Sequence, residues 1–353
     1  MADARFGSPL PAVLAIDGGN SKTDVALVAG DGTLLASIRG PGASQEDYGV
    51  EGAMRMLGEM VRKVAAQAGH DILPGGDADG AGLVARHTSS CLAGADLPEE
   101  EEQLAVALQR QGWSLTSVVA NDTFAVLRAG LTPAGGQPPW GVAVTCGAGI
   151  NCVGVAPDGR TTRFLALGPL TGDWGGGDFL GQEVMWWSMR AEDGRGPDTA
   201  LRPATAAYFG LPTVRDVAIA VHLRQIADSE LLGLTTVLFE SASAGDKVAR
   251  DLLERLAEEV CTMALTAMRR LGLTGPGTPV VLGGGLLTAR HPLLTAAIER
   301  RLAAAAPGSR PHFVDVPPVA GAALMGLDHL GADPDAERRL RASTQLGAVE
   351  AGA

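Results

Sequence analysis

The chain has 353 residues, of which 46% are hydrophobic, so it is long enough to form two domains with separate cores. A formal net charge of −12 argues against nucleic acid or an anionic membrane as a partner, because both attract a basic surface. The sequence shows no apolar leader and no run long enough to span a bilayer, and its four cysteines lack metal-ligand spacing. We therefore expect a soluble cytoplasmic protein with reduced thiols.

The first predicted elements form a hairpin with a glycine-rich tip. Two apolar runs, residues 11–16 and 25–29, predict strands on either side of Asp17-Gly18-Gly19-Asn20-Ser21-Lys22-Thr23. Glycines let backbone N–H groups converge on a bound anion, because no Cβ atom blocks the approach. Ser21 and Thr23 add hydroxyl donors, and Asp17 can hold a divalent cation through water. The hairpin alone does not distinguish a phosphate-binding tip from an ordinary turn with a buried aspartate.

The rest of the first half predicts alternating strands and helices. A third strand is expected over residues 33–38, a helix over 50–67, and a short strand ending near residue 94. A second helix begins near residue 97, with proline and acidic residues in its first turn. A buried strand over 117–120 then leads through Asn121-Asp122 into a helix over 123–129. The Pro- and Gly-rich segment 132–140 is the expected domain boundary.

Beyond this boundary the opening pattern returns. Residues 141–145 predict a strand, Cys146-Gly147-Ala148-Gly149-Ile150-Asn151 a glycine tip, and residues 152–156 the returning strand. An Asp-Gly turn and a third strand over 161–167 follow, as in the first half. This internal repeat indicates two related lobes, each of which offers a glycine hairpin to one shared cleft.

The remaining elements of the second half are mostly helical. A glycine-rich loop over 168–181 opens a helix around 183–189, and a long amphipathic helix is expected over 246–271. A strand over 279–282 runs into Gly283-Gly284-Gly285 and a helix over 291–305. A last strand over 313–316 and an apolar helix over 319–330 precede a charged tail, which we expect to be frayed from residue 333.

Two common phosphate-binding motifs are absent. A Walker A loop needs G-x-x-x-x-G-K-[ST] before a helix, whereas Lys22 follows Ser21 and leads into a strand. The tip at Gly147 begins like G-x-G-x-x-G, but the third glycine is missing and a strand follows. A nicotinamide-dependent enzyme is therefore not expected.

Five other motifs occur in one order along residues 12–330. They are Asp17 to Asp24, Asn121-Asp122, Cys146 to Asn151, Gly172-Asp173-Trp174-Gly175-Gly176-Gly177 and Leu282 to Gly285. Together they resemble the N-acetylglucosamine kinase / BadF-BadG-BcrA-BcrD type ATPase family. The resemblance implies an α/β, two-lobed actin-like ATPase fold (a duplicated ribonuclease H-like fold) with an interlobe cleft. We place the lobes at residues 1–130 and 131–332, followed by a flexible polar tail over 333–353.

The same resemblance implies roles in binding ATP and Mg²⁺. Asp17 would hold Mg²⁺ through water, and the N–H groups of residues 18–21 would meet the β- and γ-phosphates, within a motif that includes Lys22 and Thr23. Gly147, Ala148 and Gly149 would close on the phosphates from the second lobe. The run Gly283, Gly284 and Gly285 would pack against adenosine, where bare backbone allows close approach, although a strand-to-helix turn is the structural alternative.

Asp122 is the candidate base. Phosphoryl transfer to an alcohol needs a carboxylate that orients the hydroxyl and accepts its proton, and the family places that carboxylate here. The structural alternative is that Asp122 is the N-cap of the following helix. Asp173 resembles the family's acceptor for sugar hydroxyls, and we favour it over Asp178. Trp174 could stack on a pyranose ring, although tryptophans near loops are more often packing anchors. The other predicted sugar contacts are Asn121, Ile150, Asn151, Gly168 and, as a loose positional match, Gln45.

The sequence also departs from the family. Ala148 stands where a threonine is usual, so one hydroxyl contact to the phosphates is missing, and Asn20 replaces a common glycine in the first tip. The cysteine-rich zinc motif of the repressor/open-reading-frame/kinase (ROK) sugar kinases is absent, which separates the chain from that neighbouring family.

The function implied by the resemblance is phosphorylation of an amino sugar, N-acetylglucosamine at its 6-hydroxyl, by a homodimeric kinase that uses ATP and Mg²⁺. Glucosamine, N-acetylmannosamine and other hexoses stay open as substrates. A second possibility is an activator ATPase with an iron–sulfur cluster held between two subunits. In those proteins the cluster cysteines flank a helix, whereas Cys146 and Cys152 flank a glycine tip and the start of a strand, which is a poor match. A third is a nucleotide-dependent sensor or filament protein without catalysis.

Overall fold

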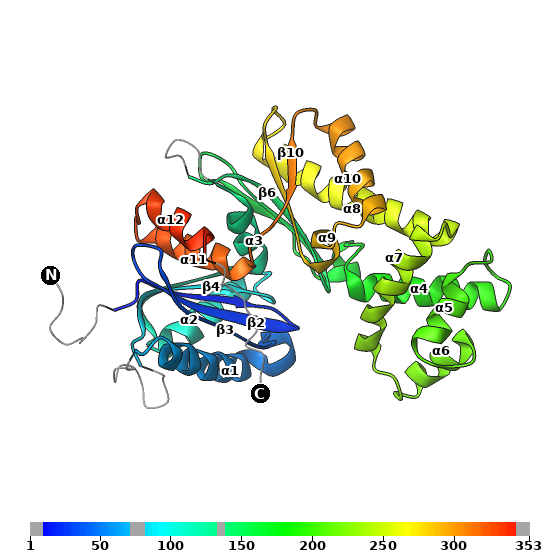
Figure 1. Cartoon of the computed structure of the whole chain (residues 1–353), viewed down its shortest axis with the longest axis horizontal. Coiled ribbons are helices and arrows are strands. Elements are labelled where there is room, and N and C mark those ends of the chain that lie inside the picture. The colour runs from blue at the N-terminus through cyan, green and yellow to red at the C-terminus, as the bar shows by residue number, and fades with distance from the viewer. Residues whose placement is uncertain (1–9, 71–81, 133–137, 344–353) are drawn as a thin grey trace. The chain divides into compact units, whose positions relative to one another are not determined.

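The computed structural model describes residues 10–70, 82–132 and 138–343, which form two compact units (Figure 1). One unit contains the chain up to Pro139 and the segment from Val314 onward, and the other contains Trp140 to Phe313. The second lobe therefore ends earlier than the expected residue 332, because the last helices return to the first unit. The chain passes from the first unit to the second between Pro139 and Trp140, within the expected boundary segment 132–140. Residues 133–137 of that segment lie outside the described residues.

The first unit is built on a five-stranded mixed sheet in the order β3-β2-β1-β4-β5. Strands β1, β2 and β3 are antiparallel neighbours, whereas β1, β4 and β5 are parallel. The carboxyl ends of β1, β4 and β5 therefore meet at one edge, where ligands of such sheets bind. The strand bounds are β1 Val13–Gly18, β2 Lys22–Val28, β3 Leu34–Pro41, β4 Ala85–Leu92 and β5 Ser114–Asn121.

Helices cover both faces of this sheet. In β1, Leu14 and Ile16 belong to the core shared with α1, whereas Val13 and Ala15 belong to the core shared with α3 and α11, as strand alternation requires. At Gly321 of α11 an added Cβ atom would lie 1.9 Å from the carbonyl oxygen of Ala125, so only glycine lets α11 approach α3 this closely. The helices of this unit are α1 Gln45–Gln67, α2 Pro98–Arg110, α3 Asp122–Gly130, α11 Pro318–His329 and α12 Pro334–Arg341.

The second unit repeats the same sheet. Its order is β10-β9-β6-β7-β8, with β6, β7 and β8 antiparallel and β6, β9 and β10 parallel. Read in reverse, this order is β8-β7-β6-β9-β10, so that β6 corresponds to β1, β7 to β2, β8 to β3, β9 to β4 and β10 to β5. This correspondence confirms the internal repeat. The strand bounds are β6 Gly141–Cys146, β7 Ile150–Val155, β8 Thr161–Arg163, β9 Pro279–Gly283 and β10 Arg310–Phe313. Thus β8 is shorter than expected, and the last strand ends at residue 313 instead of beginning there.

The core of the second unit is dominated by α8, which buries an apolar stripe along most of its length. The stripe has helical spacing and includes Leu252, Leu256, Val260, Ala264 and Met268, as the sequence predicts. Within the described residues, no helix is both long and apolar enough to cross a membrane. The helices are α4 Gly177–Glu192, α5 Leu201–Tyr208, α6 Val214–His222, α7 Leu234–Ser243, α8 Lys247–Leu271, α9 Gly285–Thr288 and α10 Pro292–Ala305, with 3₁₀ turns η1 Gly168–Thr171 and η2 Asp228–Gly233.

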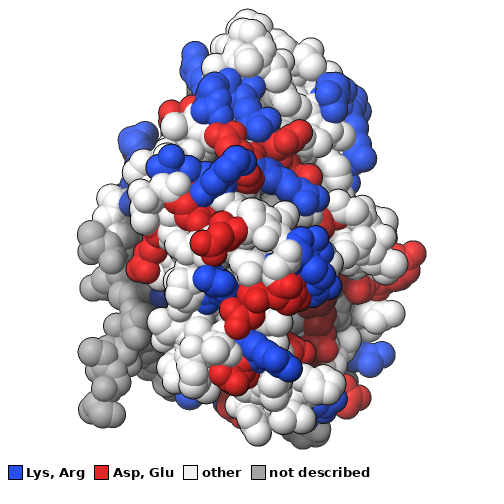
Figure 2. Space-filling model, turned by 90° about the vertical axis from the view of Figure 1, so that its right-hand side faces the viewer, with Lys and Arg blue, Asp and Glu red and all other residues white. Residues whose placement is uncertain are grey.

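The molecular surface carries charges of both signs. On the face drawn in Figure 2, acidic and basic side chains are interspersed, with uncharged surface between them. Exposed ion pairs occur on the surface, such as that of Arg300 with Glu254 on neighbouring helices of the second unit. A face that mixes both signs contributes to solubility. It does not produce the extended positive potential that would attract a polyanion such as nucleic acid.

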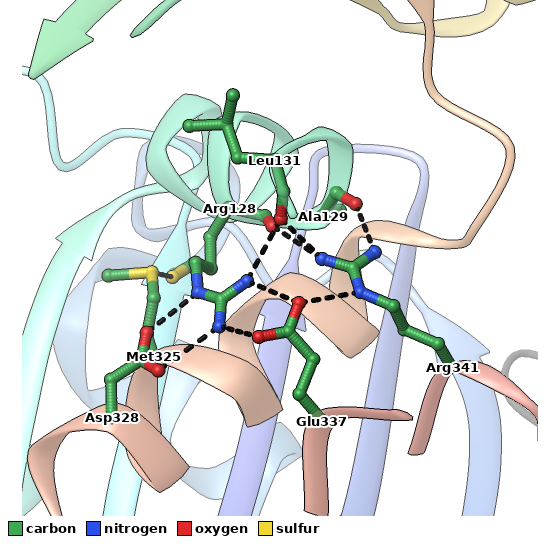
Figure 3. A network of polar contacts seen from close by, with 8 residues as sticks. Arg128, Ala129, Leu131, Met325, Asp328, Glu337 and Arg341 are labelled. Atoms are coloured by element: carbon green, nitrogen blue, oxygen red, sulfur yellow. Dashed lines mark hydrogen bonds and ion pairs between the residues drawn. The ribbon is translucent and has the colours of Figure 1, made fainter. Parts of the chain in front are cut away.

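The segment after Asp333, expected to be frayed, is a helix bound to the first unit over Pro334–Arg341 (Figure 3). Arg128 of α3 is 4% exposed and makes ion pairs of 2.7 Å with both Asp328 of α11 and Glu337 of α12. Arg341 donates to the carbonyl oxygens of Ala129 and Leu131 at the end of α3. Burial disfavours the charge of Arg128, but the hydrogen bonds to the two carboxylates outweigh this effect and raise its pKa. The network therefore fixes α11 and α12 to α3.

We expect Arg128→Ala to lower the free energy of unfolding by about 2–4 kcal/mol, because it leaves the carboxylate of Glu337 partly buried with a single remaining partner. Arg339→Ala is the matched control, since Arg339 pairs with Asp31 where both side chains are more than half exposed, and it should cost less than about 1 kcal/mol. Urea titrations of both variants measure the difference. Equal, small effects would show that the network does not stabilise the unit.

Candidate active site

The first predicted tip is a tight hairpin between β1 and β2. The backbone N–H of Gly19 donates to the carbonyl oxygen of Lys22 at 2.9 Å and closes the turn. Gly42 packs against the outside of this turn, where an added Cβ atom would lie 1.8 Å from the carbonyl oxygen of Asn20. Asn20, Ser21 and Lys22 are exposed, so the backbone of the tip is accessible, as an anion-binding tip requires.

Thr23 is the exception among the residues of this motif. Its side chain is fully buried, and its hydroxyl has no hydrogen-bond partner among the described residues. All residues of β2 from Thr23 onward are buried, because helices cover both faces of the sheet, whereas Lys22 at the start of the strand stays exposed. The structure therefore does not place the hydroxyl of Thr23 on the tip with the other predicted phosphate contacts.

Asp17 is the last side chain before the tip, and its carboxylate is crowded by other acids. It pairs across the hairpin with Asp24, whose charge is balanced by Arg39 at 2.7 Å. Burial, followed by the charges of Asp122 and Asp24, raises the pKa of Asp17 to about 8. The ionised form of Asp17 is thus costly unless a cation joins it.

A divalent cation fits this position chemically. Oxygen ligands suit Mg²⁺, and a positive charge beside Asp17 and Asp122 would offset their repulsion. No cluster of three or more His, Cys, Asp or Glu side chains able to hold a metal occurs in the described ranges. A cation at Asp17 would therefore complete its shell with water and ligand oxygens, as expected for Mg²⁺ bound with a phosphate group.

Asp122 lies at the start of α3, where β5 ends. The N-cap of α3 is Asn121, whose side-chain oxygen accepts the backbone N–H of Thr123 at 3.0 Å. Asp122 is therefore not needed as the cap, and the hydroxyl of Thr123 is a long 3.4 Å contact to its carboxylate. Burial, with a smaller contribution from the charge of Glu46, raises the pKa of Asp122. Burial and the charge of Glu46 therefore make this carboxylate a better proton acceptor than a solvent-exposed aspartate.

The amide of Asn121 is occupied within the protein. Its oxygen caps α3, and its nitrogen donates to Asp96 at 2.8 Å, with the side chain 2% exposed. These contacts give Asn121 a positioning role for its neighbour Asp122. Its predicted contact with a substrate stays a prediction.

The start of α1 brings two further polar side chains to this edge of the sheet. Gln45, a predicted substrate contact, donates to the carbonyl oxygen of Gly94 after β4. Glu46 accepts from Asn20 of the tip at 3.4 Å and acts electrostatically on Asp122. Glu46 belongs to none of the five sequence motifs, and its place beside Gln45 in a polar connection is the only sequence signal that it lies at this site.

The second predicted tip, between β6 and β7, has the same form. The N–H of Gly147 donates to the carbonyl oxygen of Gly149 at 2.9 Å, and the N–H of Gly177 at the start of α4 donates to Gly147 at 2.8 Å. An added Cβ atom on Gly147 or Gly149 would meet no atom within 4 Å, and neither has a positive φ. Neither packing nor backbone conformation requires glycine here, so the bare backbone of this tip is open to close approach by a ligand.

The third glycine run lies next to this tip. β9 pairs with β6 so that Gly283 is opposite Thr145, and an added Cβ atom on Gly284 would lie 2.4 Å from the carbonyl oxygen of Cys146. Gly284 is thus required by packing and by its φ of +82°, whereas an added Cβ atom on Gly285 would meet nothing. The structure brings together the predicted phosphate tip and the predicted adenosine motif of this unit.

The predicted sugar loop follows β8. Asp173 accepts from the hydroxyl of Thr171 at 2.6 Å, and its N–H donates to the carbonyl oxygen of Gly168 at 3.1 Å. The loop and the second tip are adjacent, because an added Cβ atom on Gly176 would lie 2.4 Å from the carbonyl oxygen of Ala148. Ile150 is 6% exposed and belongs to the core, so its side chain is not directed to a ligand.

Asn151 is the second residue of β7, opposite Thr145, and its side-chain oxygen accepts the N–H of Cys152 at 2.7 Å. Trp174 is 6% exposed, with the edge of Phe179 against it and the guanidinium of Arg255 over its ring at 4.2 Å. Its ring face is therefore covered, and the structure favours a packing anchor over a platform for a pyranose.

Comparison with known proteins adds an independent line of information. A model described as the BadF/BadG/BcrA/BcrD ATPase family matches residues 14–326. An N-acetyl-D-glucosamine kinase of Dictyostelium discoideum is 25% identical over 320 residues, covering 89% of this chain and 97% of the relative. An N-acetylmuramic acid/N-acetylglucosamine kinase of Clostridium acetobutylicum is 23% identical over 278 residues, covering 78% and 85%.

Solved structures show the fold. The crystal structure of a Chromobacterium violaceum protein assigned as an N-acetylglucosamine kinase has a TM-score of 0.70 at 22% identity, covering 90% of this chain and 99% of its own. A ROK hexokinase from Thermus thermophilus has a TM-score of 0.53 at 19% identity, covering 91% and 99%. The expected actin-like, sugar-kinase type of α/β fold is thereby confirmed.

We expect Asp17→Asn to raise the melting temperature in metal-free buffer. The raised pKa of Asp17, about 8, means that ionising this group destabilises the fold increasingly between about pH 4 and pH 8. The gain from the neutral amide should therefore be small at pH 5 and reach several degrees near pH 8. Thermal unfolding across this pH range, with EDTA present, measures it.

Asp158→Asn is the control, because Asp158 is exposed and its hydrogen bonds with Arg160 lower its pKa. It should give no gain at either pH. A melting temperature of Asp17→Asn that never exceeds that of the wild type would contradict the crowding of carboxylates at this site.

Proposed function

This chain belongs to the BadF/BadG/BcrA/BcrD ATPase family, and on that premise we propose that it is an ATP- and Mg²⁺-dependent kinase that phosphorylates N-acetylglucosamine at the 6-hydroxyl. The names of both curated relatives include N-acetylglucosamine kinase, which favours this amino sugar over glucosamine or another hexose. We extend the proposal to a homodimer that acts in the cytoplasm.

The observation that carries the proposal is the state of Asp122. Asp122 is partly buried at the start of α3, directly after β5, its carboxylate has a raised pKa, and Asn121 relieves it of capping the helix. In the proposed step Asp122 accepts the proton of the sugar hydroxyl while that oxygen forms a bond to the γ-phosphorus. The bond between the γ-phosphorus and the bridging oxygen breaks, and ADP leaves.

The other residues would hold the reactants. The backbone of residues 19–21 and of Gly147 to Gly149, where every residue is at least partly exposed, would offer N–H groups to phosphate oxygens, and Gly285 would leave room for the adenosine. Asp173, fixed by Thr171, would accept sugar hydroxyls. When bound at Asp17, Mg²⁺ would supply positive charge for the developing negative charge of the phosphates. Exclusion of water would direct the phosphoryl group to the sugar.

An activator ATPase with an iron–sulfur cluster is disfavoured by the position of the cysteines. Cys146 and Cys152 are both fully buried inside the second sheet, and burial raises the pKa of Cys146 to about 12. A cluster shared between subunits needs accessible thiolates. The structure gives these thiols no route to a partner chain.

We expect Asp122→Asn to lower kcat by about 10²–10⁴-fold, because an amide cannot accept the proton, while the dissociation constant for ATP changes less than about threefold. ADP release with ATP, Mg²⁺ and a panel of N-acetylglucosamine, glucosamine, N-acetylmannosamine and glucose measures turnover, and NMR of the product identifies the phosphorylated hydroxyl. Asp47→Asn, an exposed site on α1, is the control. Retained turnover in Asp122→Asn would remove Asp122 from the mechanism.

We expect Gly149→Ala to weaken ATP binding at least about tenfold, because the methyl group would occupy the space that phosphate oxygens need. The melting temperature should change by less than about 2 °C, since no protein atom lies within 4 Å of the added group. Gly275→Ala is the matched control, because an added Cβ atom there also meets nothing and the residue lies in a distant loop. Calorimetric titration with ATP and Mg²⁺ distinguishes the two, and equal affinities would contradict a nucleotide site at this tip.

A further inference from the structure

The loop that carries Asp173 is closed by hydrogen bonds of its own backbone. The 3₁₀ turn Gly168–Thr171 ends at Gly172, whose N–H donates to the carbonyl oxygen of Pro169 at 3.2 Å. The N–H of Asp173 donates to the carbonyl oxygen of Gly168 at 3.1 Å. Gly168 and Gly172 have φ values of +66° and +84°, where other residues are strained. The backbone therefore brings Gly168 and Asp173, two of the predicted sugar contacts, to the two ends of one tight turn.

The hydroxyl of Thr171 joins the same groups through its side chain. Its oxygen lies 2.6 Å from Oδ2 of Asp173 and 3.2 Å from the carbonyl oxygen of Gly168, and it accepts the N–H of Leu167 at 3.0 Å. A hydroxyl has a single proton, so it donates to only one of the two oxygens at a time. The carboxylate is the nearer and stronger acceptor, and the carbonyl of Gly168 already accepts the N–H of Asp173. The proton of Thr171 is therefore directed to Asp173.

The bond to Thr171 occupies one oxygen of the Asp173 carboxylate. In the part of the chain that the structure describes, the other oxygen, Oδ1, accepts no hydrogen bond from the protein, and the residue is partly exposed. A carboxylate held at Oδ2 cannot turn freely, so its Oδ1 keeps one direction. A ligand hydroxyl that binds there meets an acceptor that is already ordered, which lowers the entropic cost of binding.

We propose that Thr171 is a positioning residue of the sugar site, whose hydroxyl holds Oδ2 of Asp173 so that Oδ1 is presented to a hydroxyl of the sugar. This inference rests on the proposed kinase function, in which Asp173 accepts sugar hydroxyls. Thr171 acts through Asp173 and does not itself contact the substrate. The backbone hydrogen bonds and the two glycines close the turn without this side-chain bond, so removal of the hydroxyl should affect the carboxylate more than the fold.

The test compares Thr171→Val, which keeps the shape of the side chain without its hydroxyl, with Thr171→Ser, which keeps the hydroxyl. Steady-state kinetics use the best sugar of the panel, with saturating ATP and Mg²⁺. Thr171→Val should raise the KM for the sugar about tenfold, while kcat and the KM for ATP change less than about twofold. Thr171→Ser should stay within about threefold of the wild type. Thr235→Val is the matched control, because the hydroxyl of Thr235 also donates to a carbonyl oxygen three residues earlier, that of Leu232, and it should match the wild type.

A double-mutant cycle separates a positioning role from a merely structural one. Asp173→Ala alone should lower kcat/KM for the sugar at least about tenfold. Thr171→Val added to Asp173→Ala should lower it less than about twofold further, because the group that the hydroxyl positions is already absent. The melting temperature of Thr171→Val should fall by less than about 3 °C, since the backbone still closes the turn.

An unchanged sugar KM in Thr171→Val would overturn the role of Thr171 and leave the kinase function intact. The role is equally overturned if Thr171→Val costs as much in the Asp173→Ala background as in the wild type, if Thr171→Ser is as impaired as Thr171→Val, or if Thr171→Val does not fold. If the wild type forms no ADP in response to any sugar of the panel, the proposed function itself fails, and this inference fails with it.

Discussion

The repulsion between Asp17 and Asp122 is the constraint on which the proposed chemistry depends. The parallel strands β1 and β5, with β4 between them, end at one edge of the first sheet, which places Asp122 near enough to act electrostatically on Asp17. Burial and the charges of Asp122 and Asp24 raise the pKa of Asp17, whereas burial and the charge of Glu46 raise the pKa of Asp122. The free protein thus carries an electrostatic cost at Asp17, and in the proposed mechanism a cation bound with a phosphate group would relieve it.

The second unit uses the same topology for a different purpose. At the tip that corresponds to Asp17, it offers glycines that no packing contact requires, namely Gly147 and Gly149, and the adjacent strand end adds Gly285. The glycines that packing does require, such as Gly176 and Gly284, hold the neighbouring loops against this tip. Duplication of one sheet has therefore produced an acidic half and a bare-backbone half. The acidic half suits a cation and a proton transfer, and the bare half suits close contact with a nucleotide.

Local signals were sufficient for most of this architecture. Each glycine tip lies between two apolar runs, so the hairpins and their repetition could be read from the sequence, as could the stripe along α8. The return of α11 and α12 to the first unit could not, because it depends on contacts such as Arg128 with Glu337, which are 209 residues apart. The sequence around Asp333 is polar and charged, and only the buried partner Arg128 shows why it forms an ordered helix.

The candidate site shows the same division. Asn121 and Asp122 are both good helix caps, and the sequence could not say which of them caps α3 and which is left for chemistry. The burial of Thr23 follows from the covering of β2 on both faces, which the motif alone does not reveal.

The most direct test of this account is an NMR titration of the Asp17 carboxyl carbon in metal-free protein, repeated with ADP and Mg²⁺. We predict a pKa of about 8 without metal and a fall of several units when the cation binds. An ordinary pKa near 4 in the free protein that does not respond to ADP and Mg²⁺ would contradict it.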